Sequence, residues 1–179
     1  MKKSKYVAVG LPICRMGEDY QTLTLTIKTK DGQSVWKTQT IKDRIKLGVW
    51  ENIEFCSTPS EIFKFMSMLC DRITKEEQMK ILQELEQNRA IVYFDKEHPE
   101  QTLSTLNEIQ LVPQGGSREK GRLSLARREI KVSSEAYDLW IQLQQGMTWQ
   151  KIVQLSTGSA MDLMKALDEL IKDQLVILM

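Results

Sequence analysis

The sequence predicts an α+β fold made of two related small modules, each a β-hairpin followed by helices and a closing strand. Two helical runs share the same spacing of apolar residues, one beginning at Ser60 and the other at Ser134. Each half also ends in a short β-rich run, residues 90–94 in the first half and residues 175–179 in the second. Self-similarity on this scale indicates a repeated supersecondary unit. We therefore expect an internal duplication in which the first copy is degenerate.

Length and composition agree with two modules. The chain has 179 residues, of which 41% are hydrophobic and 27% charged, so it can bury a sizeable core. The polar stretch Asp95–Glu100 is interrupted by Pro99, which is typical of a connection between folded parts. We expect an N-terminal β-rich module over residues 1–95, a linker over 96–107 and a C-terminal module over 108–179.

Charge and cysteine content bear on the compartment. The formal net charge of +1 gives no overall attraction to nucleic acid or to an anionic membrane. No apolar run approaches the roughly 18 residues that span a bilayer, and Tyr6–Pro12 is too short for the apolar core of a signal peptide. The cysteines, at positions 14, 56 and 70, form no close pair, which favours a reducing compartment. We expect a cytoplasmic protein without a membrane partner.

The first module begins with a strand pattern. Residues 23–29 alternate between apolar and polar side chains, Asp31–Gly32 is a turn signal, and residues 34–40 form the expected partner strand. Residues 41–50 fit either a short helix or an irregular crossover. A helix start follows at Thr58, where Glu61 completes a capping box.

A second helix of the first module is expected over residues 75–88, with Met79, Leu82 and Leu85 facing inward. The second module opens with a long loop, residues 113–121, that leads into two strands. Its expected elements are strands near 122–125 and 129–132, helices over 134–145, 149–155 and 160–173, and a closing strand over 175–178.

The second module resembles winged-helix domains. Gly146–Ile152 is similar to the entry into the second helix of such domains, and Leu167–Leu170 followed by Gln174–Ile177 resembles their exit. Because its strands precede its helices, the module also resembles PqqD-type domains, which hold a peptide along a sheet edge. The resemblance covers residues 122–179 and, less closely, 23–94.

The first copy departs from this pattern at one point. Only seven residues separate Thr74 from Leu82, whereas 18 separate Thr148 from Leu167. The second helix and its turn are therefore expected to be deleted from the first copy or fused into one helix, and this copy would then be a structural or protein-binding remnant.

The expected third helix of the second module favours a protein partner over DNA. Residues 160–173 contain four acidic and two basic side chains, the wrong sign for a DNA groove. An acidic helix beside a sheet edge suits a basic or extended partner segment, added as a further strand. Trp149, at the start of a helix, is the best candidate for an exposed anchor, although a core position is the more frequent place of a tryptophan. The candidate protein-binding residues are Trp149, Asp162, Asp168 and Glu169.

A basic segment supports an alternative, a transcriptional regulator of winged-helix type that binds double-stranded DNA and can form a homodimer. Its side chains would contact phosphates, although a solvated loop is the common role of such a cluster. The candidate residues are Arg118, Lys120, Arg122, Arg127, Arg128 and Lys131.

Catalytic chemistry has few candidates in this sequence. The only histidine, His98, lies in the expected linker, and the cysteines do not have the spacing of a zinc site. The adjacent acidic pairs Glu76–Glu77 and Asp168–Glu169 point in different directions on their helices. We expect no enzymatic activity, no metal and no cofactor. The expected function is recognition of a protein or peptide, as an adaptor, chaperone-like or regulatory factor.

Overall fold

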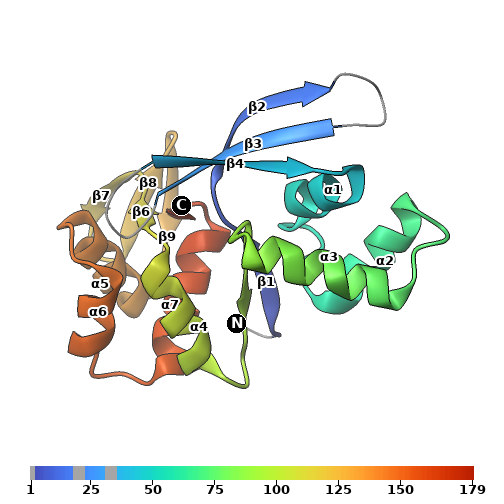
Figure 1. Cartoon of the computed structure of the whole chain (residues 1–179). Helices are drawn as coiled ribbons and strands as arrows, with labels where there is room; N and C mark the ends of the chain where they lie inside the picture. The colour runs from blue at the N-terminus through green and yellow to red at the C-terminus, as the bar shows by residue number, and fades with distance from the viewer. Residues whose placement is uncertain (1–2, 18–22, 31–35) are drawn as a thin grey trace. The chain divides into compact units, whose positions relative to one another are not determined.

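The computed structural model describes residues 3–17, 23–30 and 36–179 of the chain. These residues form a mixed α+β protein with several helices and small sheets (Figure 1). The chain divides into two compact units, which we call the N-terminal unit, Lys3–Phe94, and the C-terminal unit, Asp95–Met179. No helix within the described ranges has both the length and the apolar character that a membrane span requires.

The N-terminal unit contains two antiparallel sheets. In the smaller one, Lys5 pairs with Phe94 and Ala8 pairs with Ile91. The larger sheet has the order β2-β3-β4, so that the predicted pairing of residues 23–29 with 34–40 is found as β3 with β4. The expected turn at Asp31–Gly32 lies outside the described residues. The strands are β1 (Lys5–Ala8), β2 (Leu11–Gly17), β3 (Leu23–Lys30), β4 (Trp36–Lys42) and β5 (Ile91–Phe94).

Three helices follow the larger sheet of this unit: α1 (Arg44–Asn52), α2 (Pro59–Leu69) and α3 (Lys75–Gln87). The Asp43 carboxylate accepts hydrogen bonds from the first backbone N–H groups of α1, which resolves the ambiguity of residues 41–50 in favour of a helix. The predicted capping box of α2 is present, and α3 begins with a second one. The helix α1 packs under β3 and β4, as Figure 1 shows.

Two expectations for this unit are wrong. The unit has three helices after its sheet, so no second helix is missing. Met79 is exposed, and its neighbour Gln78 is buried instead. Burial of Gln78 is possible because its Nε2 donates to the Phe63 carbonyl at 3.1 Å and to Ser67 Oγ at 2.9 Å. Leu82 and Leu85 are buried as expected, so the inward face of α3 differs from the apolar pattern only in its first turn.

The C-terminal unit begins with a helix where a linker was expected. Residues 96–107 contain α4 (Pro99–Thr105) and the start of the 3-10 helix η1 (Leu106–Glu108). Leu103 and Leu106 are buried, and α4 packs against the last helix of the unit. This segment is therefore part of the core of the C-terminal unit.

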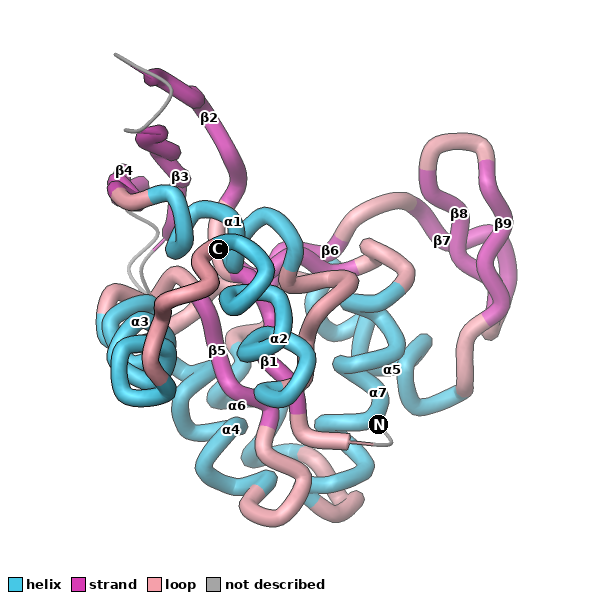
Figure 2. The backbone as a smooth tube through the Cα atoms, turned by 90° about the vertical axis from the view of Figure 1, so that its right-hand side faces the viewer, coloured by secondary structure: helices cyan, strands magenta, loops and turns pink. Residues whose placement is uncertain are grey.

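The remaining elements of the C-terminal unit agree with the expected strands and helices, except that two strands were not expected: β6, which ends at Pro113, and β7, which lies in the expected loop over residues 113–121. The sheets are β6 with β10, and β7-β8-β9, whose strands lie side by side in Figure 2. The elements are β6 (Leu111–Pro113), β7 (Gly116–Glu119), β8 (Arg122–Leu125), β9 (Arg128–Lys131), α5 (Ser134–Gln144), α6 (Trp149–Leu155), α7 (Ala160–Lys172) and β10 (Val176–Leu178).

After α4 and η1, the C-terminal unit has the same order of elements as the N-terminal unit: a strand, a three-stranded antiparallel sheet, three helices and a closing strand that pairs with the first strand. Hydrogen bonds at the closing strand also correspond. Val9 N–H donates to the Ala90 carbonyl at 2.9 Å, and Gln114 N–H donates to the Leu175 carbonyl at 2.8 Å. In both units the residue before this carbonyl residue, Arg89 or Gln174, has a positive φ. Ala90 and Leu175 therefore hold equivalent places.

Candidate functional site

The N-terminal unit has a groove of about 310 Å³ beside β4, which we call the β4 groove. Within the described residues β4 pairs only with β3, so its other edge has no strand neighbour. The groove lies between this strand, the start of α1 and the end of α3. Its lining residues are Gln39, Thr40, Ile41, Lys46, Glu84, Leu85, Asn88 and Ala90.

The lining of the β4 groove combines an apolar floor with polar groups. Ile41, Leu85 and Ala90 are buried. The Oε1 atom of Gln39 is also buried and has no hydrogen-bond partner among the described residues. A buried acceptor without a partner costs about 1–3 kcal/mol, and a ligand that donates a hydrogen bond would remove that cost. The groove can therefore hold an apolar side chain of a ligand, and an N–H group of the same ligand could donate a hydrogen bond to Gln39 Oε1.

An ion pair forms one wall of the β4 groove. Lys46 on α1 pairs with Glu84 on α3, and this hydrogen bond with its charge lowers the pKa of the Glu84 carboxyl. Both side chains are partly exposed, so the pair joins the two helices where the groove opens to solvent. The wall carries no net charge.

The C-terminal unit has a larger groove of about 660 Å³ between α5, α6 and α7. Four carboxylates and one ammonium group line it, a net of three negative charges, and we call it the acidic groove. Its charged lining residues are Glu135, Asp138, Asp162, Lys165 and Glu169, and its apolar ones are Leu139, Ile152, Leu155, Leu163 and Ala166.

Two of the four carboxylates hold the unit together. Glu169 accepts hydrogen bonds from Ser133 N–H at 2.8 Å and from Ser133 Oγ at 2.6 Å, which ties α7 to the start of α5. Asp162 accepts from Ser159 Oγ at 2.7 Å and pairs with Lys165 at 3.1 Å. These two contacts lower the pKa of the Asp162 carboxyl.

The other two carboxylates, those of Glu135 and Asp138, are exposed and form no ion pair with any residue in the described ranges. Leu155 lies in the same groove with 58% of its surface exposed. A large apolar side chain beside unpaired charges is typical of a contact surface. The acidic groove therefore offers both charge and apolar area to a partner.

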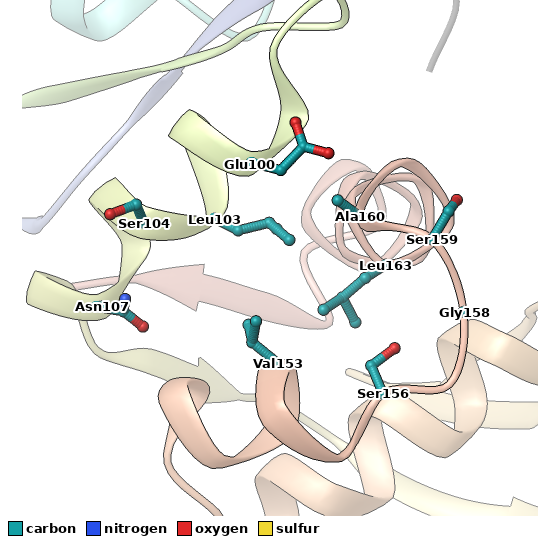
Figure 3. A pocket seen from close by; sticks show the side chains of 10 residues that line it. All are labelled: Glu100, Leu103, Ser104, Asn107, Val153, Ser156, Gly158, Ser159, Ala160 and Leu163. Atoms are coloured by element: carbon teal, nitrogen blue, oxygen red, sulfur yellow. The ribbon is translucent and has the colours of Figure 1, made fainter.

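A smaller hollow of about 360 Å³ lies on the other side of the turn between α6 and α7. Figure 3 shows Leu103 from α4, Val153 from α6 and Leu163 from α7 pointing toward its centre. Ser104, Asn107 and Ser156 stand around the rim. Ser156, Gly158 and Leu163 line both this hollow and the acidic groove, so the two recesses adjoin at the α6–α7 turn.

The structure brings only some of the predicted protein-binding residues together. Asp162 and Glu169 line the acidic groove, whereas Asp168 is partly buried on α7 and lies outside that lining. Trp149 is only 5% exposed, and its Nε1 donates to the Leu103 carbonyl at 2.9 Å. The expectation of an exposed anchor at Trp149 is therefore wrong, because this indole joins α6 to α4 in the core.

The predicted nucleic-acid-binding residues are all exposed on or beside the sheet β7-β8-β9; they are Arg118, Lys120, Arg122, Arg127, Arg128 and Lys131. Arg122 is engaged locally, because it pairs with Glu119 at 2.8 Å and with Glu129 at 2.9 Å. Arg127 lies at the tip of the β8–β9 hairpin, where it and Ala126 both have positive φ values, 69° and 47°. The five other basic side chains form no ion pair with a described residue.

The remaining titratable groups offer little chemistry. His98 precedes α4, and its Nδ1 lies 2.9 Å from Asp95 Oδ2; this contact raises the pKa of His98. Burial raises the pKa of Tyr6 far above its ordinary value and also raises that of Glu86. No cluster of three or more metal-ligating side chains is present in the part of the chain that the structure describes.

Comparison with known proteins adds no assignment, because no family model, curated protein or solved structure matches this chain. The β4 groove is the feature that the sequence pattern did not reveal. The one feature of the sequence that relates to this groove is Ala90. This small residue lines the groove at the position that the larger Leu175 occupies in the C-terminal unit. The β4 groove and the acidic groove are therefore the features of this structure that bear on function.

Proposed function

We propose that this protein binds an extended segment of another polypeptide along the open edge of β4, with one side chain of that segment in the β4 groove. The observation that carries the proposal is the open strand edge beside a groove with a buried, unpaired acceptor, Gln39 Oε1. An added strand gains backbone hydrogen bonds from such an edge and specificity from an adjoining side-chain pocket.

The resemblance to PqqD-type domains supports the same mode, since that family holds a peptide along a sheet edge. The residues that carry this resemblance lie mainly in the second module, over residues 122–179, whereas the β4 groove lies in the first module. In both units the last strand of the three-stranded sheet precedes three helices. The proposal therefore includes descent of the two units from one duplicated winged-helix-like module, in which the first copy keeps the peptide-binding role.

The test uses the full chain and a phage library of random 12-residue peptides. Enriched peptides are synthesised, and backbone amide exchange is measured with and without each peptide. We expect slower exchange at residues 38–41 in the bound state, because an added strand protects the edge amides. Protection confined to other segments, or no enrichment at all, would contradict the proposal.

A matched pair of variants sharpens the test. Asn88 lines the groove and is exposed, so Asn88→Trp should block the groove without disturbing the core. Gln87, the last residue of α3, is exposed and lies outside the lining, which makes Gln87→Trp the control. We expect at least a tenfold loss of peptide affinity in the first variant and none in the second.

A second candidate function, binding of double-stranded DNA, rests on the exposed basic residues of β7-β8-β9. The acidic side chains of α7 oppose the entry of that helix into a DNA groove. An electrophoretic shift at low salt that is lost in Arg127→Ala/Arg128→Ala would support DNA binding. Failure to shift any duplex at low salt would exclude it.

A further inference from the structure

We infer that the acidic groove is a second docking site, for a short amphipathic helix that carries basic residues around one large apolar side chain. This site lies wholly in the C-terminal unit, so it is separate from the β4 groove. The inference does not depend on the function proposed for β4, and it would give the protein two chemically different binding sites.

The shape of the groove selects a helix over an extended segment. Its walls are α5, α6 and α7, and no strand contributes a lining residue. An extended segment buried there would find no row of backbone donors and acceptors, and its own N–H and C=O groups would stay unpaired. A helix satisfies its backbone internally and needs only side-chain contacts from the groove.

The charge of the groove selects a cationic occupant. Glu135 and Asp138 lie three residues apart on α5, and therefore on one face of that helix. Neither forms an ion pair within the described ranges, so both are free to pair with Lys or Arg of a partner. Asp162 and Lys165 already neutralise each other at 3.1 Å. An anionic partner would meet uncompensated repulsion.

An exposed apolar contact provides the anchor point. Leu155 ends α6 and is 58% exposed, and Leu139, Ile152 and Leu163 also line the groove. The volume of about 660 Å³ is large enough for a Leu, Phe or Trp side chain with its neighbours. The rim charges would then mainly set orientation and association rate.

The experiment uses the full chain and a labelled 14-residue peptide of leucine and lysine in helical periodicity, followed by fluorescence anisotropy at two salt concentrations. A peptide in which glutamate replaces each lysine is the ligand control. We expect the lysine peptide to bind and the glutamate peptide not to bind. Equal binding of both peptides would overturn the inference.

Two groove variants and a charge-matched control locate the site. Glu135→Gln/Asp138→Asn should weaken the lysine peptide about tenfold at low salt and reduce the dependence on salt. Leu155→Ser should weaken it about fivefold by removing apolar contact. Glu54→Gln/Glu76→Gln, which removes two exposed charges from the N-terminal unit, should change nothing.

The outcomes separate a defined site from general attraction. If the control pair weakens binding as much as the groove pair, or if Leu155→Ser has no effect, the acidic groove is not the site. Asn88→Trp should leave the lysine peptide unaffected, because it alters only the β4 groove. Loss of binding in Asn88→Trp would likewise overturn the inference.

Discussion

Each unit has a buried tryptophan at the same place in the first helix after its three-stranded sheet, and the two indoles bond differently. Trp50 on α1 donates from Nε1 to two carbonyls, those of Val9 at 3.2 Å and Ala90 at 3.1 Å. Trp140 on α5 donates to the Gln114 carbonyl alone, at 3.0 Å. Val9 and Gln114 are equivalent, since each bonds the closing strand. Both indoles thus donate to the carbonyl of the equivalent residue, Val9 or Gln114, and only Trp50 has a second acceptor, the Ala90 carbonyl.

A carboxylate at an equivalent position of the third helix shows a similar difference. Glu84 on α3 forms an ion pair with Lys46 inside α1, whereas Glu169 on α7 accepts two hydrogen bonds from Ser133 at the start of α5. In each unit the carboxylate joins the last helix to the first helix after the three-stranded sheet. The two units therefore make the same joint with different chemistry, an ion pair in one and hydrogen bonds from a serine in the other.

The largest expected effect comes from equivalent core residues. Leu82 and Leu167 are fully buried, so Leu82→Ala and Leu167→Ala should each lower the free energy of unfolding by about 2–5 kcal/mol. We expect amide exchange to increase mainly in the unit that carries the substitution. An equal increase in both units would show that they unfold together, and the comparison of separate units would fail.

The indole bonds give the next effect. Trp50→Phe removes one N–H that two carbonyls share, whereas Trp140→Phe removes an N–H with a single acceptor. Each lost bond should cost about 1 kcal/mol, with the slightly larger cost for Trp50. Urea unfolding of the two variants measures the difference. Equal costs would mean that the second bond of Trp50 contributes nothing.

The carboxylate joints should differ in kind. Glu169→Gln places an amide against the Ser133 donors and should cost about 1 kcal/mol, nearly independent of salt. Glu84→Gln loses a partly exposed ion pair, and its smaller effect should disappear at high salt. Unfolding at 0.05 and about 1 M NaCl distinguishes the two, and a salt-sensitive Glu169→Gln would contradict the assignment.

The β8–β9 turn should allow a gain in stability. Arg127 has a φ of 69°, a region that glycine adopts without steric cost. Arg127→Gly should therefore raise the stability of the C-terminal unit by up to about 1 kcal/mol, while Arg127→Ala should not. A loss of stability in Arg127→Gly would show that the arginine side chain contributes more than its backbone strain costs.

The smallest effect is a dependence on pH in the C-terminal unit, which contains the only histidine. Asp95 raises the pKa of His98, and the contact lowers the pKa of Asp95. The contribution of His98 is complete below its ordinary pKa of about 6.5 and is lost as the pH rises through the raised value. The contribution of Asp95 is lost as the pH falls through its lowered value. Titration by NMR should show a raised pKa for His98 that returns to normal in Asp95→Asn.

Local capping chemistry made the C-terminal unit largely predictable. Ser133, Thr148 and Ser159 each accept a hydrogen bond from a backbone N–H in the first turn of the following helix, and Gly146 ends α5 with a φ of 76°. These signals are short in range and can be read from one sequence. The helix α1 has Gly48 in its middle. Because glycine is a poor helix former, the local sequence did not clearly predict this helix.

That glycine has a packing reason. A Cβ at Gly48 would lie 2.9 Å from Leu69 Cδ1, so a larger residue there would make the Leu69 side chain shift where α1 and α2 meet. The spacing of apolar residues matched the run that begins at Ser60 with the run that begins at Ser134, and so paired α2 with α5. In the structure α2 is the second helix after its three-stranded sheet, whereas α5 is the first. Any two amphipathic helices share the same apolar period, so the period cannot identify equivalents.

The candidate sites depended on contacts that a single sequence does not contain. The acidic residues of α7 were predicted from charge, and Asp162 and Glu169 do line a groove. The role of Trp149 was not predictable, because its partner, the Leu103 carbonyl, lies 46 residues away in a segment expected to be a linker. The β4 groove likewise depends on which residues of α1, α3 and β4 meet around Ala90.

The buried indoles also make the chain a source of its own optical signals. Trp50 is shielded in the N-terminal unit, and Trp140 and Trp149 are shielded in the C-terminal unit. A tryptophan that moves from a packed interior into water emits at longer wavelength. A variant that keeps only Trp50 would therefore report the opening of the N-terminal unit by the colour of its emission, and one that keeps only Trp149 would report the other unit.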